Sequence, residues 1–438
     1  MSMAKHASKS RPHEYQRIRV LFPDHLGLAR GKYLPAAHGA THANHCIGIF
    51  ALTFDRTMVP APGGGMLEGF PDCTATFSLD DVRPGWEPET GVVVADLELD
   101  GKPLAISPRH TLRKAVADWQ ALGYRANVGI ELEAYIMAPD GNGGWKPWDT
   151  PGAYVYGTGT ACDPVGLFEE IMRTAEASGL PVESINSEFD TPQWELTLVF
   201  GEALAAVDNI FLFKVMAREV AARHGLLLTY LGRPFVDRAG SGLHVNFSLV
   251  DKKGKNAFGD ASSKDGLSKL AHHCIGGLIA HHEGMSAMCA PTVNAYKRLR
   301  AGQLAGYWAN WGYDHRGVTV RVPAARGQSA RLEHRMPDGS ASPYLATAAV
   351  LQAARLGHVN GTGSPVPEKQ DCLEHQSATR HTPDDLGRAL EAFEADKELY
   401  DAIGPEMSAL FVAIKQAEWQ KFRVAVTDWE LDHYLPFL

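Results

Sequence analysis

Two glutamates in the segment VGIELEAYIM, Glu131 and Glu133, are two residues apart, a spacing that could bring two carboxylates to one site. On a β-strand both carboxylates project from one face, while Ile130 and Leu132 point to the other. Like charges in so small a space raise each other's pKa unless a cation neutralises them, so a metal site would explain the pair. For an isolated pair, a solvated strand face is the alternative.

A second acidic pair, Glu188 and Glu195, lies in INSEFDTPQWELTLVF. Their spacing of seven residues would put them on opposite faces of one straight strand. The intervening sequence Asp190-Thr191-Pro192 is typical of a turn, so a bend there would let the two acids meet. The four carboxylates of both pairs are therefore expected to converge.

A histidine follows two glycines in DRAGSGLHVNFSLV, where Gly240 and Gly242 precede His244. Glycine lets a backbone come close to a ligand, and the histidine begins an alternating strand. A lone histidine is more often an ordinary core or surface residue. The glycines make His244 a candidate ligand without establishing it.

Basic residues surround a further glutamate in SARLEHRMPD, where Arg331, Glu333 and Arg335 share one face of a predicted strand. A surface ion-pair ladder is the alternative interpretation. Arg298, in PTVNAYKRLRAGQ, carries a planar guanidinium suited to a carboxylate or a phosphate. Further cations follow downstream at Arg316 and Arg321.

Several elements must position these side chains. The segments expected to be helices are 108–123, 164–178, 202–224, 264–289, 343–356, 384–395 and 405–422. Strands are expected at 126–137, 182–188, 193–199, 243–249, 318–322 and 330–336, and earlier at 74–79 and 92–99. We expect a flexible tail over 1–12, a small β-rich domain over 13–106 and a larger domain over 107–438.

Composition excludes several classes of protein. The 438 residues have a formal net charge of −9, which argues against a nucleic-acid partner. The chain has no apolar run of the roughly 20 residues that a membrane span needs, so we expect no membrane partner and a cytoplasmic location. The six cysteines form no C-x-x-C pair, which indicates neither a zinc site nor a disulfide framework.

Taken in order along the chain, these motifs resemble the glutamine synthetase superfamily. The matching segments are VLFPDHLGLARGKYLP, IELEAYI, SEFDTPQWE, AGSGLHVNFSL, PTVNAYKRL, RLEHRMPDGSASPYLATAAVL and VTDWELDHYL. The sequence is most similar to the glutamylpolyamine and γ-glutamylamine synthetase branch, whose members often end as Trp429 to Leu435 do here. The resemblance implies an α+β fold. A small N-terminal β-grasp domain would precede a catalytic domain with a curved antiparallel sheet flanked by helices.

The resemblance also implies a reaction and its cofactors, ATP and Mg²⁺ or Mn²⁺. The γ-carboxylate of glutamate would attack the terminal phosphate of ATP, and an amine would displace the phosphate from the γ-glutamyl phosphate. The implied ligands of one ion are Glu133, Glu188 and Glu195, and those of the other are Glu131, His244 and Glu333. The resemblance further implies a homo-oligomer of stacked rings, a dodecamer or a decamer.

Other residues take roles by the same resemblance. Arg316 and Arg321 would contact phosphate, and Asn246 and Ser248 the nucleotide. Arg298 and Arg335 would bind the amino-acid substrate, beside Gly240, Leu304 and Trp308. Arg298, Arg316 and Asp55 are the implied catalytic residues, with Asp55 lent to a neighbouring subunit.

Three positions depart from the pattern of the ammonia-using enzymes. Ala239 replaces an asparagine that helps to hold glutamate, Leu304 replaces a flap glutamate, and Asn246 replaces a histidine at the nucleotide. Because the flap carboxylate takes up a proton from ammonia, Leu304 favours a primary amine as the acceptor. An ordinary glutamine synthetase and a non-catalytic structural homologue are the alternatives.

Overall fold

The N-terminal part of the protein is a small domain made of two four-stranded sheets. The computed structural model describes residues 15–438, so the tail expected at 1–12 lies outside the described residues. One sheet has the order β2-β1-β6-β5, with strands Ala29–Pro35, Arg17–Pro23, Thr90–Val94 and Arg83–Pro84. The other has the order β3-β4-β7-β8, with strands His42–Cys46, Asp72–Thr76, Asp96–Leu99 and Lys102–Pro103.

A ten-stranded sheet dominates the rest of the chain, and β9 (Arg125–Pro139) lies at its centre. The main path runs β11-β12-β9-β15-β18-β17-β16, with strands Val182–Ser187, Gln193–Leu198, β9 itself, Leu243–Val250, Leu332–His334, Val320–Val322 and Trp311–Tyr313. Three short strands also pair with β9, namely β10 (Trp145–Pro147), β13 (Gly201–Glu202) and β14 (Leu227–Thr229). The long central strand is therefore held along both edges.

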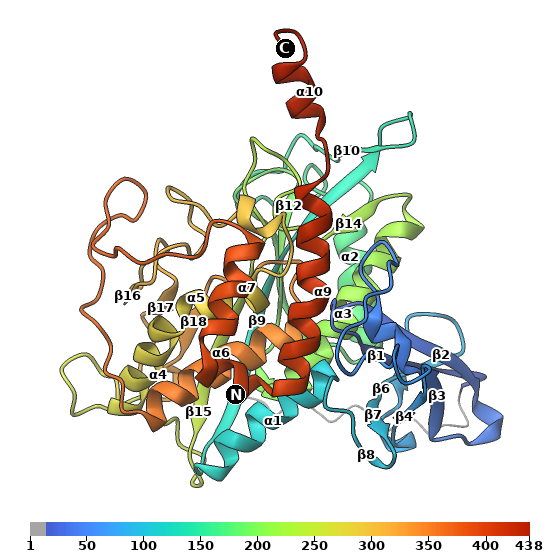
Figure 1. Ribbon diagram of the computed structural model, residues 1–438, viewed down its shortest axis with the longest axis horizontal. Coiled ribbons are helices and arrows are strands. Elements are labelled where there is room, and N and C mark those ends of the chain that lie inside the picture. The colour runs from blue at the N-terminus through green and yellow to red at the C-terminus, as the bar shows by residue number, and fades with distance from the viewer. Residues whose placement is uncertain (1–14) are drawn as a thin grey trace.

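Helices cover the apolar face of this sheet (Figure 1). The α-helices of the described residues are α1 (Pro108–Ala121), α2 (Leu167–Ala177), α3 (Ala203–Arg223), α4 (Lys269–Ala280), α5 (His282–Cys289), α6 (Pro343–Val359), α7 (Leu386–Ala395), α8 (Lys397–Ile403), α9 (Pro405–Arg423) and α10 (Asp428–Tyr434). Of these, α10 projects away from the sheet. Short 3-10 helices lie at Ala36–His38, Ile47–Ala51, Leu79–Asp81, Ala295–Lys297 and Gly327–Ser329. Within residues 15–438, no helix is long and apolar enough to span a bilayer.

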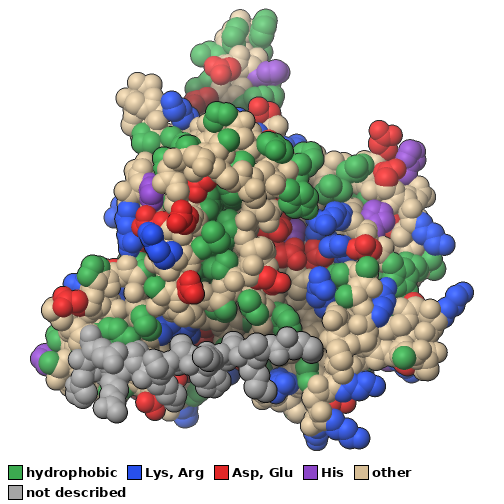
Figure 2. Space-filling view, turned by 180° about the vertical axis from the view of Figure 1, so that it is seen from behind, with side chains coloured by type: hydrophobic (Ala, Val, Ile, Leu, Met, Phe, Trp, Pro, Cys, Tyr) green, Lys and Arg blue, Asp and Glu red, His purple; other side chains and the backbone are tan. Residues whose placement is uncertain are grey.

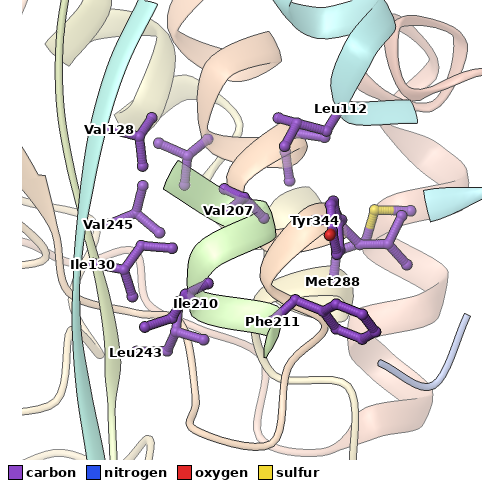
Figure 3. Packing of buried hydrophobic residues seen from close by; sticks show 14 of the residues in the cluster. Leu112, Val128, Ile130, Val207, Ile210, Phe211, Leu243, Val245, Met288 and Tyr344 are labelled. Carbon is purple, nitrogen blue, oxygen red and sulfur yellow. The ribbon is translucent and has the colours of Figure 1, made fainter. Parts of the chain in front are cut away.

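The core lies between the sheet and α3, as Figure 3 shows. Even-numbered residues of β9 and odd-numbered residues of β15 face the α3 side chains, and those drawn are Val128, Ile130, Leu243, Val245, Val207 and Ile210. Because side chains alternate along a strand, the odd-numbered residues of β9 lie on the opposite face of the sheet. One face of β9 thus supports the core, and the other is free to carry polar groups.

The architecture confirms the predicted fold class, while some boundaries differ. The segment expected to be one strand at 92–99 is two strands, because the chain leaves the first sheet after Val94 and joins the second at Asp96. The helix expected at 264–289 begins at Lys269, where Ser268 caps it, and is broken at His281. We propose the domain boundary at residues 106 and 107, between β8 and α1.

Candidate functional site

Strand register brings the predicted acids together on one face of the sheet. In β9, Glu131 lies opposite His244 of β15, and Glu133 lies opposite Glu195 of β12. On the other side of β15, Glu333 of β18 lies opposite Asn246 of β15. Figure 2 shows Asp and Glu side chains gathered in a hollow on one face of the molecule, with Lys and Arg side chains beside them.

The turn between Glu188 and Glu195 forms as expected. The amide of Gln193 donates to the carbonyl of Asp190 at 3.0 Å, and the amide of Glu188 donates back to the carbonyl of Gln193 at 2.8 Å. The chain therefore reverses direction, and the side chain of Glu188 reaches those of Glu133 and Glu195. A spacing unsuited to one straight strand is suited to this bend.

Two neighbouring groups of ligand atoms result. Within each group, one atom from every residue lies within 4.8 Å of the others. The first group consists of Glu133, Glu188 and Glu195, and the second of Glu131, His244 and Glu333. All six side chains that the resemblance assigned to metal are therefore close enough to bind ions.

The carboxylates of these groups are buried and repel one another, and a bound cation would reduce that repulsion. Burial, followed by repulsion from the neighbouring carboxylates, raises the pKa of Glu195 to about 8. The pKa of Glu188 is also raised, by burial and by Glu133. Burial is the largest effect on Glu131 and acts in the same direction. The hydrogen bond with His244, the charges of His244 and Arg335 and the hydrogen bond from Asn246 together outweigh it and lower the pKa of Glu131 to about 2. The first group holds more negative charge than protein cations balance, so its chemistry fits a divalent ion.

Two arginines flank the buried carboxylate of Glu333. Arg321 donates to Glu333 at 2.8 Å, and Arg335 donates to its other oxygen at 2.5 Å. The Nε atoms of both arginines are buried and have no hydrogen-bond partner among residues 15–438. The side chains of Glu333 and Arg335 are thus buried and do not form the surface ladder that was the alternative for Arg331, Glu333 and Arg335. The unpaired Nε atoms of Arg321 and Arg335 can still donate hydrogen bonds to a ligand.

A cavity of about 270 Å³ opens beside the acids, over the face formed by β9, β12 and β15. It is lined by Glu131, Asn246 and Ser248, and also by Phe200. Gly129 of β9 forms part of the wall, and a side chain there would come within 3.0 Å of Phe200. One end of the cavity is therefore formed by a carboxylate of the second group, Glu131.

Asn246 links this cavity to the acids. Its amide nitrogen donates to Glu131 at 3.0 Å, and its amide oxygen accepts from Arg331 at 3.1 Å. A neutral amide therefore occupies the place of the family's histidine and still fixes a carboxylate.

Glycines allow Arg298 to approach the first group. A Cβ at Gly240 would lie 2.6 Å from Cγ of Arg298, and one at Gly242 would lie 2.7 Å from both Arg298 Nη2 and His244 Nε2. Arg298 is buried and donates to the main-chain carbonyls of Met336 and Arg335 at 2.9 and 3.2 Å. The glycines of the G-S-G motif therefore provide room for two candidate site residues.

Leu304 lies on a loop that is attached to the acids. Arg335, which holds Glu333, also donates to the carbonyl of Leu304 at 3.4 Å. The side chain of Leu304 is 46% exposed. The loop therefore presents an apolar side chain at the position where the resemblance implies a flap carboxylate in the ammonia-using enzymes.

The aromatic residues that follow Leu304 have different roles. Tyr307 stacks on His381 with ring centroids 4.9 Å apart, and Trp308 packs edge-on against both rings. Trp311 is buried in the core, and the hydroxyl of Tyr313 donates to Asp265 at 2.6 Å. Of the four rings, only Tyr307 and Trp308 remain candidates for contact with an acceptor.

Two predicted residues lie farther from the acids. Arg316 is exposed, and it lowers the pKa of Glu188 only as a minor contributor after burial, Glu133 and others. Asp55 forms an ion pair with Lys421 of α9. Within this one chain, the side chain of Asp55 is therefore held by α9, the helix that precedes the C-terminal segment, and not by the acids.

Sequence reasoning missed Gln193, which connects two parts of the site. Its amide nitrogen donates to Glu133 at 3.1 Å and to the carbonyl of Gly240 at 3.0 Å. The available signal was its position two residues before Glu195, on the same face of β12. Asp338 was also missed; it is fully buried near Arg298, and one of its carboxylate oxygens has no hydrogen-bond partner in residues 15–438.

Comparison with known proteins agrees with this geometry, in which two groups of potential metal ligands adjoin a cavity. Residues 105–434 match the glutamine synthetase catalytic domain family, so the chain belongs to that family. The glutamine synthetase of Clostridium saccharobutylicum is 36% identical over 80% of this chain and 81% of its own. That of Pyrococcus abyssi is 31% identical over 95% of this chain and 96% of its own.

Solved structures extend the likeness to the whole fold. Apo GmaS without ligand superposes with a TM-score of 0.85 and 30% identity, covering 99% of this chain and all of that one. A GmaS/ADP complex gives the same TM-score at 28% identity, covering 98% of this chain and all of the other. Enzymes of this family use ATP and divalent metal ions, and the cavity and the acids described above are consistent with both.

Proposed function

We propose that the protein joins the γ-carboxylate of glutamate to a primary amine through a γ-glutamyl phosphate, with ATP as the phosphoryl donor. The observation that carries the choice of amine is Leu304, an apolar side chain on the loop that Arg335 ties to Glu333. A carboxylate at that position would bind ammonium and accept its proton. GmaS, a γ-glutamylmethylamide synthetase with a closely similar fold, supports the same assignment.

Each residue of the site has a role in this proposal. Glu133, Glu188 and Glu195 would hold one divalent ion, and Glu131, His244 and Glu333 the other. Mg²⁺ bound there would neutralise charge that develops on the transferring phosphoryl group. Arg298 and Arg335 would fix the carboxylates of glutamate near the first group, because guanidinium matches them in shape and charge.

The nucleotide and the phosphoryl group involve a second set of residues. Asn246 and Ser248 would orient ATP in the 270 Å³ cavity, with Arg321 at its phosphates. Arg316 would approach the same phosphates from the exposed side and stabilise the transition state. Asn246 and Arg321 are already ordered by hydrogen bonds to Glu131 and Glu333, so little rearrangement of these two side chains has to accompany the reaction.

The acceptor pocket favours a monoamine over a polyamine. Tyr307 and Trp308 offer ring faces to an alkyl group or an ammonium. A polyamine would want further acids, and Asp314, the nearest in sequence, is engaged by Arg321 at 2.6 Å. Small alkylamines and aromatic amines are therefore the expected acceptors.

An ADP-release assay tests the proposal. Purified protein would receive glutamate, ATP, Mg²⁺ and one of ammonia, methylamine, ethylamine, benzylamine or putrescine. We expect a monoamine to have the highest kcat/KM. If ammonia exceeds every amine, the protein is an ordinary glutamine synthetase, the alternative that its relatives' names favour. No ADP release with any acceptor would favour a non-catalytic homologue, which the retention of five mutually repelling acids argues against.

We also propose that the protein forms a homo-oligomer of stacked rings. Asp55 is exposed at the edge of the N-terminal domain, where a neighbouring subunit could use it. The C-terminal helix α10 projects from the body of the molecule (Figure 1), and Trp429, Leu435 and Phe437 on this segment are 61%, 71% and 85% exposed. Apolar side chains exposed to this extent are typical of a surface that another subunit covers.

A further inference from the structure

A second cleft, separate from the acids and the nucleotide cavity, lies between the N-terminal domain and the catalytic domain. Its volume is about 830 Å³, which is within the usual range for small-molecule sites. Its walls come from the turn and strand around Leu26 to Arg30, from α3, from the segment 226–231 after α3, and from α9. Figure 1 shows α3 and α9 beside the N-terminal strands.

The acidic side chains of this cleft are already paired. Glu219 binds Arg19 at 2.8 Å, and Glu418 binds Lys415 at 2.8 Å. Arg30, which also lines the cleft, is paired with Asp24 at 2.7 Å. These six side chains form three ion pairs and therefore contribute little net charge that a ligand could use.

Two other cations of the cleft, Lys214 and Arg218 on α3, have no such partner. No carboxylate of residues 15–438 lies within 4 Å of either side chain, although both line the cleft. Lys214 donates to the carbonyls of Gly339 and Ala341 at 2.9 and 3.4 Å. Arg218 is exposed and makes no hydrogen bond within the described part of the chain. One turn of helix thus presents two positive groups to the same space.

The surroundings of Lys214 leave its charge only partly compensated. Burial lowers the pKa of Lys214 to about 7; the charge of Asp338 opposes this without offsetting it, and the charge of Arg218 adds a smaller lowering effect. Its ammonium also lies 4.7 Å from the ring centroid of Tyr230. An anion in the cleft would stabilise the charged form of Lys214 and occupy the free donors of Arg218.

The rest of the cleft is apolar. Leu28, Phe54, Leu227, Leu231 and Val293 all line it. Phe54 and Leu231 are 48% and 38% exposed, so each offers a hydrophobic surface to a ligand. A ligand that fits would have one anionic end and one short apolar end.

We propose that this cleft binds a small organic carboxylate with a short apolar chain, held at its anionic end by Lys214 and Arg218. The planar guanidinium of Arg218 suits a planar carboxylate. One negative charge is sufficient, since one of the two cations is only partly protonated near neutral pH. This site goes beyond the proposed ligase function and shares no residue with it.

The cleft is nevertheless connected to the substrate residues. Lys214 holds the main chain at Gly339 and Ala341, and Arg298 holds the same segment at Met336. A carboxylate that draws Lys214 toward itself would compete with those carbonyl oxygens. Occupation of the cleft is therefore expected to change the KM for glutamate, which Arg298 would bind.

Calorimetric titration of the full-length protein with hexanoate tests the proposal. Saturating glutamate and Mg²⁺ would be present, so that hexanoate cannot simply fill the glutamate site. We expect one hexanoate per chain, with 1-hexanol and inorganic phosphate each at least about tenfold weaker. Hexanol lacks the negative charge of hexanoate, and phosphate lacks its apolar chain. The two control ligands therefore separate the contribution of the carboxylate to binding from that of the alkyl chain.

Variants locate the binding. Arg218→Gln and Lys214→Met should each weaken hexanoate about tenfold or more, and Lys214→Arg should retain binding. Lys146→Met, which removes an exposed cation elsewhere, is the matched control and should leave binding unchanged. If Lys214→Met does not fold, Arg218→Gln decides. Absence of hexanoate binding, or equal binding by wild type and Arg218→Gln, would overturn the proposal. The titration measures no turnover, so it fails independently of the ligase assignment.

Discussion

At the level of single residues, Leu304 offers the sharpest test of acceptor choice. Leu304→Glu would place a carboxylate on the loop that Arg335 attaches to the acids. We expect kcat/KM for ammonia to rise about tenfold or more relative to that for methylamine, because the new acid can bind ammonium and take its proton. Leu122→Glu, at the end of α1, is a control that should leave the ratio unchanged. An unaltered ratio in Leu304→Glu would remove the main support for an amine acceptor.

Removal of one acid should separate metal binding from stability. Burial and its neighbours raise the pKa of Glu195, so Glu195→Gln relieves repulsion in the metal-free protein. Without Mg²⁺ we expect an equal or higher melting temperature, and with Mg²⁺ an affinity reduced about tenfold or more. Calorimetry with and without Mg²⁺ measures both effects, and the exposed Glu176→Gln is the control. A variant that binds Mg²⁺ as tightly as the wild type would contradict the metal assignment.

Residue spacing predicted most of the candidate site because its acids come from strands that alternate. Glu131 and Glu133 share a face by period alone, and the turn chemistry near Pro192 explains how Glu188 reaches Glu195. The bridging role of Gln193 depends on contacts with β9 and with Gly240, which no local pattern reveals. Whether these residues perform the roles assigned to them stays a prediction.

At the level of elements, long periodic segments were predicted well and junctions poorly. The helix at Ala203–Arg223 and the strand at Leu243–Val250 lie within one residue of expectation. The single strand predicted at 92–99 is interrupted at Ala95, where the chain passes from one sheet to the other. The apolar pattern continues through this residue and so gave no sign of the interruption. Helix α10 is seven residues long and was missed, because so short a segment shows too little periodicity.

The start of α5 should make stability depend on pH. His282 is fully buried, its Nε2 hydrogen-bonds to the carbonyl of Tyr307, and burial lowers its pKa from 6.5 to about 4. The unfolded chain therefore binds more protons than the folded chain over this interval, so stability is complete above pH 6.5 and falls below it. By pH 4 this histidine alone should cost roughly 3 kcal/mol.

His282→Gln tests the origin of that loss. Glutamine can still donate to Tyr307, but it does not titrate. The difference in unfolding free energy between pH 7 and pH 4.5, measured by urea denaturation, should be smaller in the variant. The exposed His375→Gln serves as the control. An equal pH dependence in wild type and His282→Gln would show that other groups cause the loss.

At the level of the whole molecule, the C-terminal segment should control assembly. Deletion of residues 425–438 removes α10 and its exposed apolar side chains while leaving α9 intact. We expect light scattering to report a particle of about half the original mass, as separated rings would give. A matched full-length variant, Glu176→Gln, should keep the original mass. Unchanged mass after deletion would show that the segment does not join the rings.

The central position of β9 has a kinetic consequence. This strand pairs with five others and carries Glu131 and Glu133, so fraying at an edge of the sheet does not expose its amides. Its deuterium uptake should be limited by global unfolding and be among the slowest in the chain. Added Mg²⁺ should slow uptake in β9 by the same factor as it lowers the unfolded population. Because the backbone of β9 stays closed, the ion must then arrive and leave through the hollow in which the acidic side chains lie.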